Sequence, residues 1–203
     1  MSHDEWTAAR RWPPLAAGAL ACATSAADGS VAMQVPAHAE IQLRCEGANH
    51  GPAFMTWATG GDDIDAGTFS LLNTQFQDAF VELAGATTWP ETGAITANIY
   101  EDLVLRKVRV AGATVSIAPA GGGLAYVSDA RLPDPALDAS TLGGPAVFVD
   151  LAESASGDDV VVTISHPTRD CRGGFGWPTD DPRALRTRVR AGALVNFTFV
   201  CPP

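Results

Sequence analysis

The side chains that most often carry out catalysis are scattered through this sequence. No Gly-x-Ser-x-Gly nucleophile motif occurs. The four histidines show no His-x-x-x-His spacing of the kind that binds zinc; they are His3, His38, His50 and His166. The glycine run at 121–123 lacks the Lys-Ser/Thr of a phosphate-binding loop, so we expect a hairpin turn there. We therefore predict that the protein is not an enzyme, with no catalytic residues, no cofactor and no metal ion.

Basic side chains form one stripe along the sequence, near residue 186. Arg186, Arg188 and Arg190 recur with a period of two, so on a strand all three lie on one face. Arg183 precedes them and extends the group. The simpler interpretation is a solvated strand face. The functional interpretation is a contact for a polyanion or for an acidic neighbouring subunit, formed by Arg183, Arg186, Arg188 and Arg190.

Acidic residues cluster in two turn-like segments. Each segment is bounded by Gly or Pro, which favours a turn; the residues are Asp62, Asp63 and Asp65 in one and Asp180 and Asp181 in the other. We interpret both as solvated turns. A hard cation such as calcium at a subunit contact is the alternative, because such ions take several oxygens from one loop.

The cysteines are widely spaced, with no Cys-x-x-Cys pair that would indicate zinc; they are Cys22, Cys45, Cys171 and Cys201. Two disulfides in any of three connectivities are compatible with the sequence. We favour buried free thiols, because cysteine packs as a small apolar side chain.

Composition points to an acidic protein rich in strands and turns. The chain has 203 residues, a net charge of −10, 46% hydrophobic residues, 20 Gly and 14 Pro. Many breakers between short apolar runs favour strands over long helices. The chain has 13 Lys and Arg residues against 23 Asp and Glu, and Lys107 is the only lysine. This acidic balance argues against a basic arm of the kind that binds nucleic acid.

Residues 1–30 are predicted to be an irregular N-terminal arm, and 31–203 a single β domain. The apolar stretch at 15–27 resembles a weak signal segment. His3, Asp4 and Glu5 spoil the basic start of such a signal, and Pro13 and Pro14 interrupt it, so we favour an arm that is retained. No other stretch approaches the length of a membrane span, and we expect no membrane contact.

Apolar-polar alternation and chain breakers place the strands. The predicted strands are 31–35, 39–45, 54–58, 76–84, 103–118 in two parts, 124–127, 146–151, 160–165, 187–189 and 193–200. Phe76, Phe80 and Leu83 also fit a helix, but Gly85 and Trp89-Pro90 favour the end of a strand. A helical turn is predicted over 93–102 and another over 136–142. The fold class is mostly β: a single-domain, antiparallel β-sandwich.

The segment from Ile95 to Pro119 resembles a known family. Tyr100 after a helical turn, a strand of basic-x-Val-x-Val form over 107–110, and Pro119 are followed by the Gly turn, a strand, and an Asp-Pro loop at 133–142. This order is similar to jelly-roll coat proteins of small icosahedral viruses. The acidic chain without a basic arm, and Gln75-Phe76-Gln77, make tymovirus-like coats the most similar group.

That resemblance implies a jelly roll of two four-stranded sheets, and a structural capsid protein that self-assembles into an icosahedral virion around the genome. Its partners would be copies of itself and, weakly, viral RNA. The first alternative is an exported bacterial β-sandwich, secreted or periplasmic, such as an adhesin, a pilus-like subunit or a carbohydrate-binding module. Such a protein would use its cysteines in disulfides. A phage tail or head-decoration protein is the second alternative.

Overall fold

A computed structural model describes residues 3–6, 22–62, 71–103, 108–155 and 158–203. These residues form fourteen strands and one helix, α2 (Thr74–Leu83), so the mostly-β prediction is confirmed. The strands are β1 (His3–Trp6), β2 (Cys22–Ala23), β3 (Glu40–Gly47), β4 (His50–Ala58), β5 (Gly93–Tyr100), β6 (Thr114–Ala118), β7 (Gly123–Val127), β8 (Pro133–Asp134), β9 (Ala146–Leu151), β10 (Val160–Ser165), β11 (Arg172–Phe175), β12 (Trp177–Pro178), β13 (Ala184–Thr187) and β14 (Leu194–Val200).

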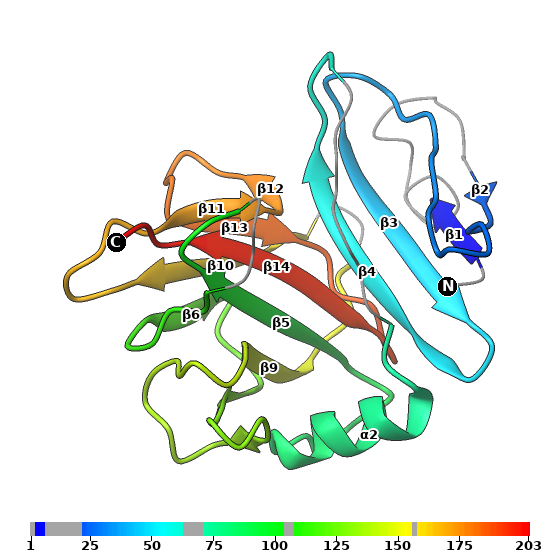
Figure 1. The fold of residues 1–203 in the computed structure, drawn as a ribbon. Helices are drawn as coiled ribbons and strands as arrows, with labels where there is room; N and C mark the ends of the chain where they lie inside the picture. The colour runs from blue at the N-terminus through cyan, green and yellow to red at the C-terminus, as the bar shows by residue number, and fades with distance from the viewer. Residues whose placement is uncertain (1–2, 7–21, 63–70, 104–107, 156–157) are drawn as a thin grey trace.

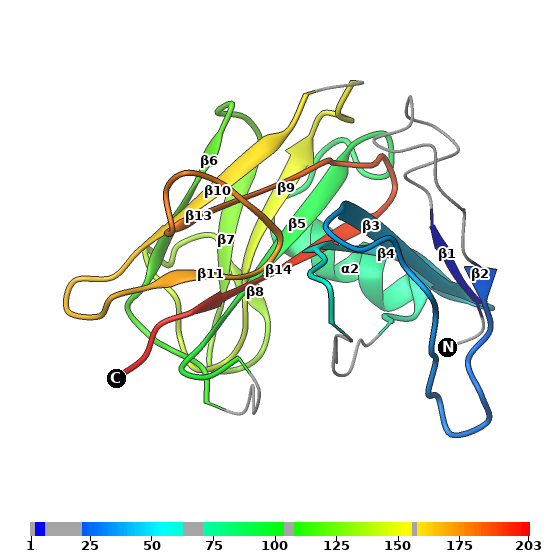
Figure 2. The ribbon, with the colours of Figure 1, turned by 90° about the horizontal axis from the view of Figure 1, so that it is seen from above.

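The strands make two sheets that pack face to face (Figures 1 and 2). The large sheet has the order β2-β1-β3-β4-β14-β5-β9-β7-β8, with β11 also paired to β14. The small sheet has the order β12-β13-β10-β6. β1 and β2 lie within the segment predicted to be an irregular arm, and residues 1–2 and 7–21 of that segment lie outside the described residues.

The last strand, β14, lies in the middle of the large sheet and runs parallel to both of its main-path neighbours, β4 and β5. The prediction of a wholly antiparallel sandwich is therefore wrong at this strand. The small sheet has the four strands that a jelly roll would have, but the large sheet has ten, so the structure does not confirm a jelly roll.

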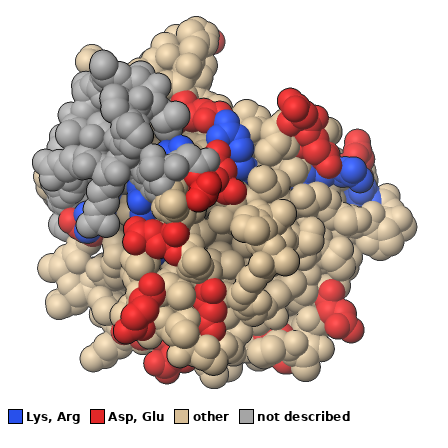
Figure 3. Space-filling model, turned by 180° about the vertical axis from the view of Figure 1, so that it is seen from behind, with Lys and Arg blue, Asp and Glu red and all other residues tan. Residues whose placement is uncertain are grey.

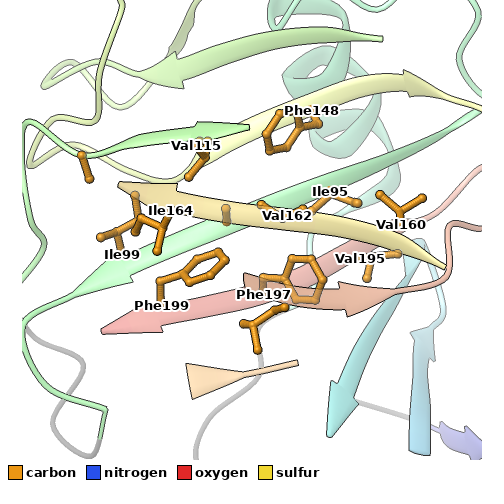
Figure 4. Packing of buried hydrophobic residues seen from close by; sticks show 14 of the residues in the cluster. Ile95, Ile99, Val115, Phe148, Val160, Val162, Ile164, Val195, Phe197 and Phe199 are labelled. Atoms are coloured by element: carbon orange, nitrogen blue, oxygen red, sulfur yellow. The ribbon is translucent and has the colours of Figure 1, made fainter. Parts of the chain in front are cut away.

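The core fills the space between the two sheets. Val162 and Ile164 of β10 point from the small sheet toward Phe197 of β14 (Figure 4). Alternate residues of β5 and β14 face this core, so each of these strands contributes every second side chain. The residues of these two strands that belong to this core are Ile95, Ala97, Ile99, Val195, Phe197 and Phe199.

Residues 74–83 form helix α2, so the predicted strand over 76–84 is wrong. The Asn73 side chain accepts a hydrogen bond from the backbone N–H of Gln75 and caps the helix start. At the other end the N–H of Gly85 donates to the carbonyl of Glu82, and Gly85 has a φ of +96°. Gly85 therefore ends a helix, where the sequence analysis took it to end a strand.

Residues 93–100 form strand β5, so the helical turn predicted over 93–102 is also wrong. Ile95 and Ile99 are four residues apart, which fits a helix and a strand equally. Ala97 lies between them and is also buried, whereas Asn98 is half-buried on the other face. This period of two, together with β-branched and aromatic residues, stabilises a strand.

In the described part of the segment 103–118 there is one strand, β6, at an edge of the small sheet, so the other predicted part is not a strand over 108–113. Residues 104–107 lie outside the described residues. Val108 is 53% exposed, while Val110 and Val115 are buried in the core. β6 ends at Ala118, before Pro119. The glycine turn that follows connects β6 to β7 of the other sheet, so it is a corner between sheets and not a hairpin. The predicted strand at 31–35 and helical turn at 136–142 are also absent from the described residues.

One hydrogen bond joins the two sheets at the edge strand β6. The phenol oxygen of Tyr126, on β7, accepts the backbone N–H of Val115 at 3.0 Å. Tyr126 is 2% exposed, and burial raises the pKa of its phenol. We expect Tyr126→Phe to lower the free energy of unfolding by about 1–3 kcal/mol, because a buried N–H loses its acceptor. Urea denaturation measures this loss, and a variant as stable as the parent would contradict the assignment.

The outer face of the large sheet is covered in two places. Helix α2 packs Val81 and Ala84 over β5, β9 and β7. The second cover lies over β3 and β4, where Met33, Val35 and Leu71 pack against a cluster that contains Trp57.

Candidate functional site

The predicted arginine group lies where the small sheet meets the β3–β4 end of the large sheet. Arg186 and Arg188 share a face, as the period of two predicts: both guanidinium groups bond the carboxylate of Asp159, at 2.6 and 3.1 Å, and both lie over the ring of Trp177. Arg186 also pairs with Glu40 of β3. These contacts connect three segments that are far apart in the sequence.

Burial alone would lower the pKa of Arg186, but the hydrogen bonds to Glu40 and Asp159 outweigh it and raise the pKa. Arg188 and Arg190 are 7% and 5% exposed. Arg190 lies 3.6 Å from Glu153. The positive charges of these three side chains are therefore met by carboxylates of the same chain, in a largely buried position.

Arg183 lies apart from this network. It is exposed and pairs with Asp181 across a short turn. Figure 3 shows the same pattern on the back of the molecule, where each group of basic side chains has acidic ones beside it. The contact with a polyanion or a neighbouring subunit stays a prediction, and in this geometry Arg183 is the member of the group that such a partner would reach most easily.

Two hydrogen bonds from side chains to backbone carbonyls stabilise the same junction. The indole N–H of Trp177 donates to the carbonyl of Ile41 at 3.0 Å, and the amide of Gln42 donates to the carbonyl of Arg188 at 3.0 Å. Gln42 is 1% exposed. We call Glu40, Gln42, Asp159, Trp177, Arg186 and Arg188 the sheet junction. Its geometry indicates a structural tie between the two sheets.

The acidic clusters take different positions. Asp181 accepts a hydrogen bond from the N–H of Arg183, and this bond and the side-chain bond to Arg183 lower the pKa of Asp181. This is the solvated turn that the sequence analysis favoured. Asp63 and Asp65 lie outside the described residues. Within the described part of the chain, no group of three or more acidic, His or Cys side chains is arranged to hold a metal ion.

Cys171 and Cys201 form a disulfide, so the prediction of free thiols is wrong for this pair. It joins the residue before β11 to the residue after β14, and both cysteines are buried, at 3% and 0% exposure. The pairing depends on the antiparallel contact of β11 with β14, which brings Arg172 opposite Val200. The sequence spacing alone does not indicate that contact.

Polar contacts surround the disulfide. Arg169 donates to the carbonyl of Cys201 at 3.0 Å and to the carboxylate of Glu101 at 2.8 Å. The N–H of Cys201 donates to the carbonyl of Tyr100. The end of β14 is thus attached to β5 and β11 by covalent, ionic and hydrogen bonds.

A ladder of polar side chains on β5 and β14 was missed by the sequence analysis. Thr96 lies opposite Asn196 and donates to its side-chain oxygen, and Asn98 donates to the carbonyl of Phe197. Arg109 donates to Asn98 and lies over the ring of Tyr100. The signal was present in the alternation of these residues with buried Ile and Phe. These groups hold the central parallel pair together.

Asp150 fastens the loop between α2 and β5 to the end of β9. Its carboxylate accepts backbone and hydroxyl hydrogen bonds from both Thr87 and Thr88, at 2.8–3.1 Å. Burial would raise the pKa of Asp150, but these bonds lower it to about 2. Asp150 has a φ of +56°, in the left-handed region that is uncommon for residues other than glycine. The hydrogen bonds from Thr87 and Thr88 hold it there.

We expect Asp150→Ala to lower the free energy of unfolding by about 1–2 kcal/mol, a discounted figure because solvent screens this partly exposed carboxylate. The pKa of Asp150 is lower in the folded than in the unfolded protein, so its contribution is complete above about pH 4 and is lost as the pH falls toward 2. Urea denaturation of parent and variant at pH 6 and pH 2.5 measures both effects. An equal stability difference at the two pH values would contradict this role.

Within the described residues, no helix has both the length and the apolar character needed to cross a membrane. No protein-family model, curated protein or solved structure matches the chain.

Proposed function

We propose that this protein is an exported, disulfide-stabilised β-sandwich domain that works by binding a partner and not by catalysis. The observation that carries this proposal is the buried disulfide between Cys171 and Cys201. Disulfides persist in secreted and periplasmic proteins, whereas the cytosol keeps most thiols reduced. Of the functions that the sequence suggested, the exported adhesin, pilus-like subunit or carbohydrate-binding module is the one that expects paired cysteines.

Binding is favoured over catalysis by the state of the ionisable groups that the fold brings together. Asp159 and Glu40 are engaged by Arg186, and Asp150 is engaged by backbone and hydroxyl donors. Carboxylates that are engaged in this way hold the fold together.

The coat-protein function remains a prediction from the resemblance. Two features of the fold lend it no support: the parallel pairing of β14 with β4 and β5, and the ten strands of the large sheet.

Cell fractionation tests the export proposal. Cells that make the protein are separated into medium, periplasmic extract and cytosol, and the protein is detected in each fraction. The proposal expects the protein in the medium or the periplasmic extract. Protein found only in the cytosol, or packed inside virus-like particles, would overturn it.

A further inference from the structure

Helix α2 carries apolar side chains on two faces, and the sheet covers only one of them. Val81 and Ala84 are buried against the sheet, at 0% and 2% exposure. Phe76 and Leu83 are 52% and 50% exposed. Figure 1 shows α2 at the lower edge of the molecule, outside the sheet.

Phe80, which is partly buried against the core under the helix, lies between these two exposed residues. Phe76, Phe80 and Leu83 are spaced by four and three residues and so lie on one side of the helix. The rings of Phe76 and Phe80 are stacked, with centroids 6.1 Å apart. Leu132 is 49% exposed and directly precedes β8, which contacts α2. We call Phe76, Phe80 and Leu83 the α2 patch.

Contiguous exposed apolar side chains, especially with a polar rim, are typical of interaction surfaces. The two phenylalanines and the leucine would stabilise the complex with an apolar partner in proportion to the exposed area that the partner buries. In the folded domain about half of the surface of Phe76 and of Leu83 remains exposed to water.

The charges around the α2 patch indicate the chemistry of its partner. Residues 71–92 contain Asp78, Glu82 and Glu91 but no Lys, Arg or His. Arg131, beside Leu132, is the exception on the neighbouring loop. The lower part of Figure 3, at the end of the molecule where α2 lies, likewise shows acidic and no basic side chains. The patch is therefore apolar with a mainly acidic rim.

We propose that the α2 patch binds a cationic amphipathic segment of another protein. Apolar side chains of that segment would pack on Phe76, Phe80 and Leu83, and its Lys or Arg side chains would meet Glu82 and the neighbouring acidic groups. An anionic lipid surface is disfavoured, since the acidic rim repels it. A second copy of this chain is also disfavoured, because it brings the same acidic rim and a charge of −10.

Two synthetic helical peptides test the proposal. One has a leucine face and a lysine face, and the other has the same pattern with glutamate in place of lysine. Binding to the intact protein is measured by calorimetry at two salt concentrations. The variants are Phe76→Ser/Leu83→Ser, Glu82→Lys, and the control Val108→Ser, which removes an exposed apolar side chain elsewhere on the molecule.

The Leu/Lys peptide is expected to bind the parent and the Val108→Ser control equally, and the double serine variant at least about tenfold more weakly. Glu82→Lys should also weaken binding of the Leu/Lys peptide, and its loss of affinity relative to the parent should be larger at the lower salt concentration. The Leu/Glu peptide should not bind. The double variant has the same net charge as the parent. If the peptide bound only by general attraction to an acidic protein, its affinity for the double variant would therefore equal its affinity for the parent. Equal affinity of parent and double variant would overturn the proposal.

Two other results would also overturn it, and each would identify a different occupant. Dimerisation of the peptide-free parent that is lost in Phe76→Ser/Leu83→Ser would assign the patch to a second copy, as measured by sedimentation. Binding of the parent, but not of the double variant, to phosphatidylglycerol vesicles would assign it to a membrane surface. The double variant should remain folded, with an unfolding midpoint only slightly below that of the parent, because about half of each side chain is already exposed.

Discussion

Replacement of Cys201 by serine is expected to lower the free energy of unfolding by about 3–4 kcal/mol. The disulfide partners are separated by 30 residues, and a cross-link over a loop of this length restricts the unfolded chain by about that amount. Cys171→Ser should cost about the same, because either substitution removes the same cross-link.

The double variant Cys171→Ser/Cys201→Ser provides the control. Its loss should be close to that of either single variant, since the cross-link can be lost only once. Urea denaturation of the three variants, and of the parent with a reducing agent, measures the effect. A double variant that loses the sum of the two single losses would show that the cysteines act separately.

Replacement of Val110 by aspartate is expected to prevent folding. Val110 is 2% exposed and belongs to the core between the sheets, and a buried carboxylate without a partner costs far more than a cavity. Val110→Ala should lower the free energy of unfolding by about 1–3 kcal/mol, and Val115→Ala should behave similarly.

Side chains on the opposite face give the matched controls. Ser116 is exposed, so Ser116→Ala should leave the stability nearly unchanged. Arg109→Ala should cost about 0.5–1 kcal/mol, because Arg109 lies 4.9 Å over the ring of Tyr100. Denaturation curves of these variants test directly which side chains around Val110 and Val115 point into the core. If Arg109→Ala were more destabilising than Val110→Ala, the assignment of faces would be wrong.

Strands that alternate clearly and end at breakers were predictable from the sequence. The strands at 146–151 and 160–165 have the predicted bounds. Predictions of helix or strand were wrong where the spacing of apolar residues fits both structures, as with Ile95 and Ile99, which lie four residues apart. For α2 the decisive signals were the end residues, Asn73 and Gly85, which the apolar pattern does not include.

The position and direction of β14 could not be predicted. Val195, Phe197 and Phe199 indicate a buried strand, but its neighbours β4 and β5 come from the first half of the chain. Their pairing depends on the packing of the whole domain. For the same reason the disulfide was missed, since it follows from the pairing of β11 with β14.

The candidate site was predicted in part. The shared face of Arg186 and Arg188 follows from their spacing, and the structure confirms it. Their partners could not be inferred, because Glu40 lies 146 residues from Arg186 and meets it only through the packing of β3 near the small sheet. The exposed stripe of α2 was visible as Phe76, Phe80 and Leu83, but its exposure depends on which face of the helix the sheet covers.

The proposal of an exported domain is tested most directly by the thiol state of the protein in the cells that make it. Whole cells are quenched with acid, free thiols are alkylated, and the unreduced protein is digested and analysed by mass spectrometry. The account predicts a linked pair of peptides that contain Cys171 and Cys201, separable only after reduction. Recovery of both cysteines as alkylated thiols would contradict it.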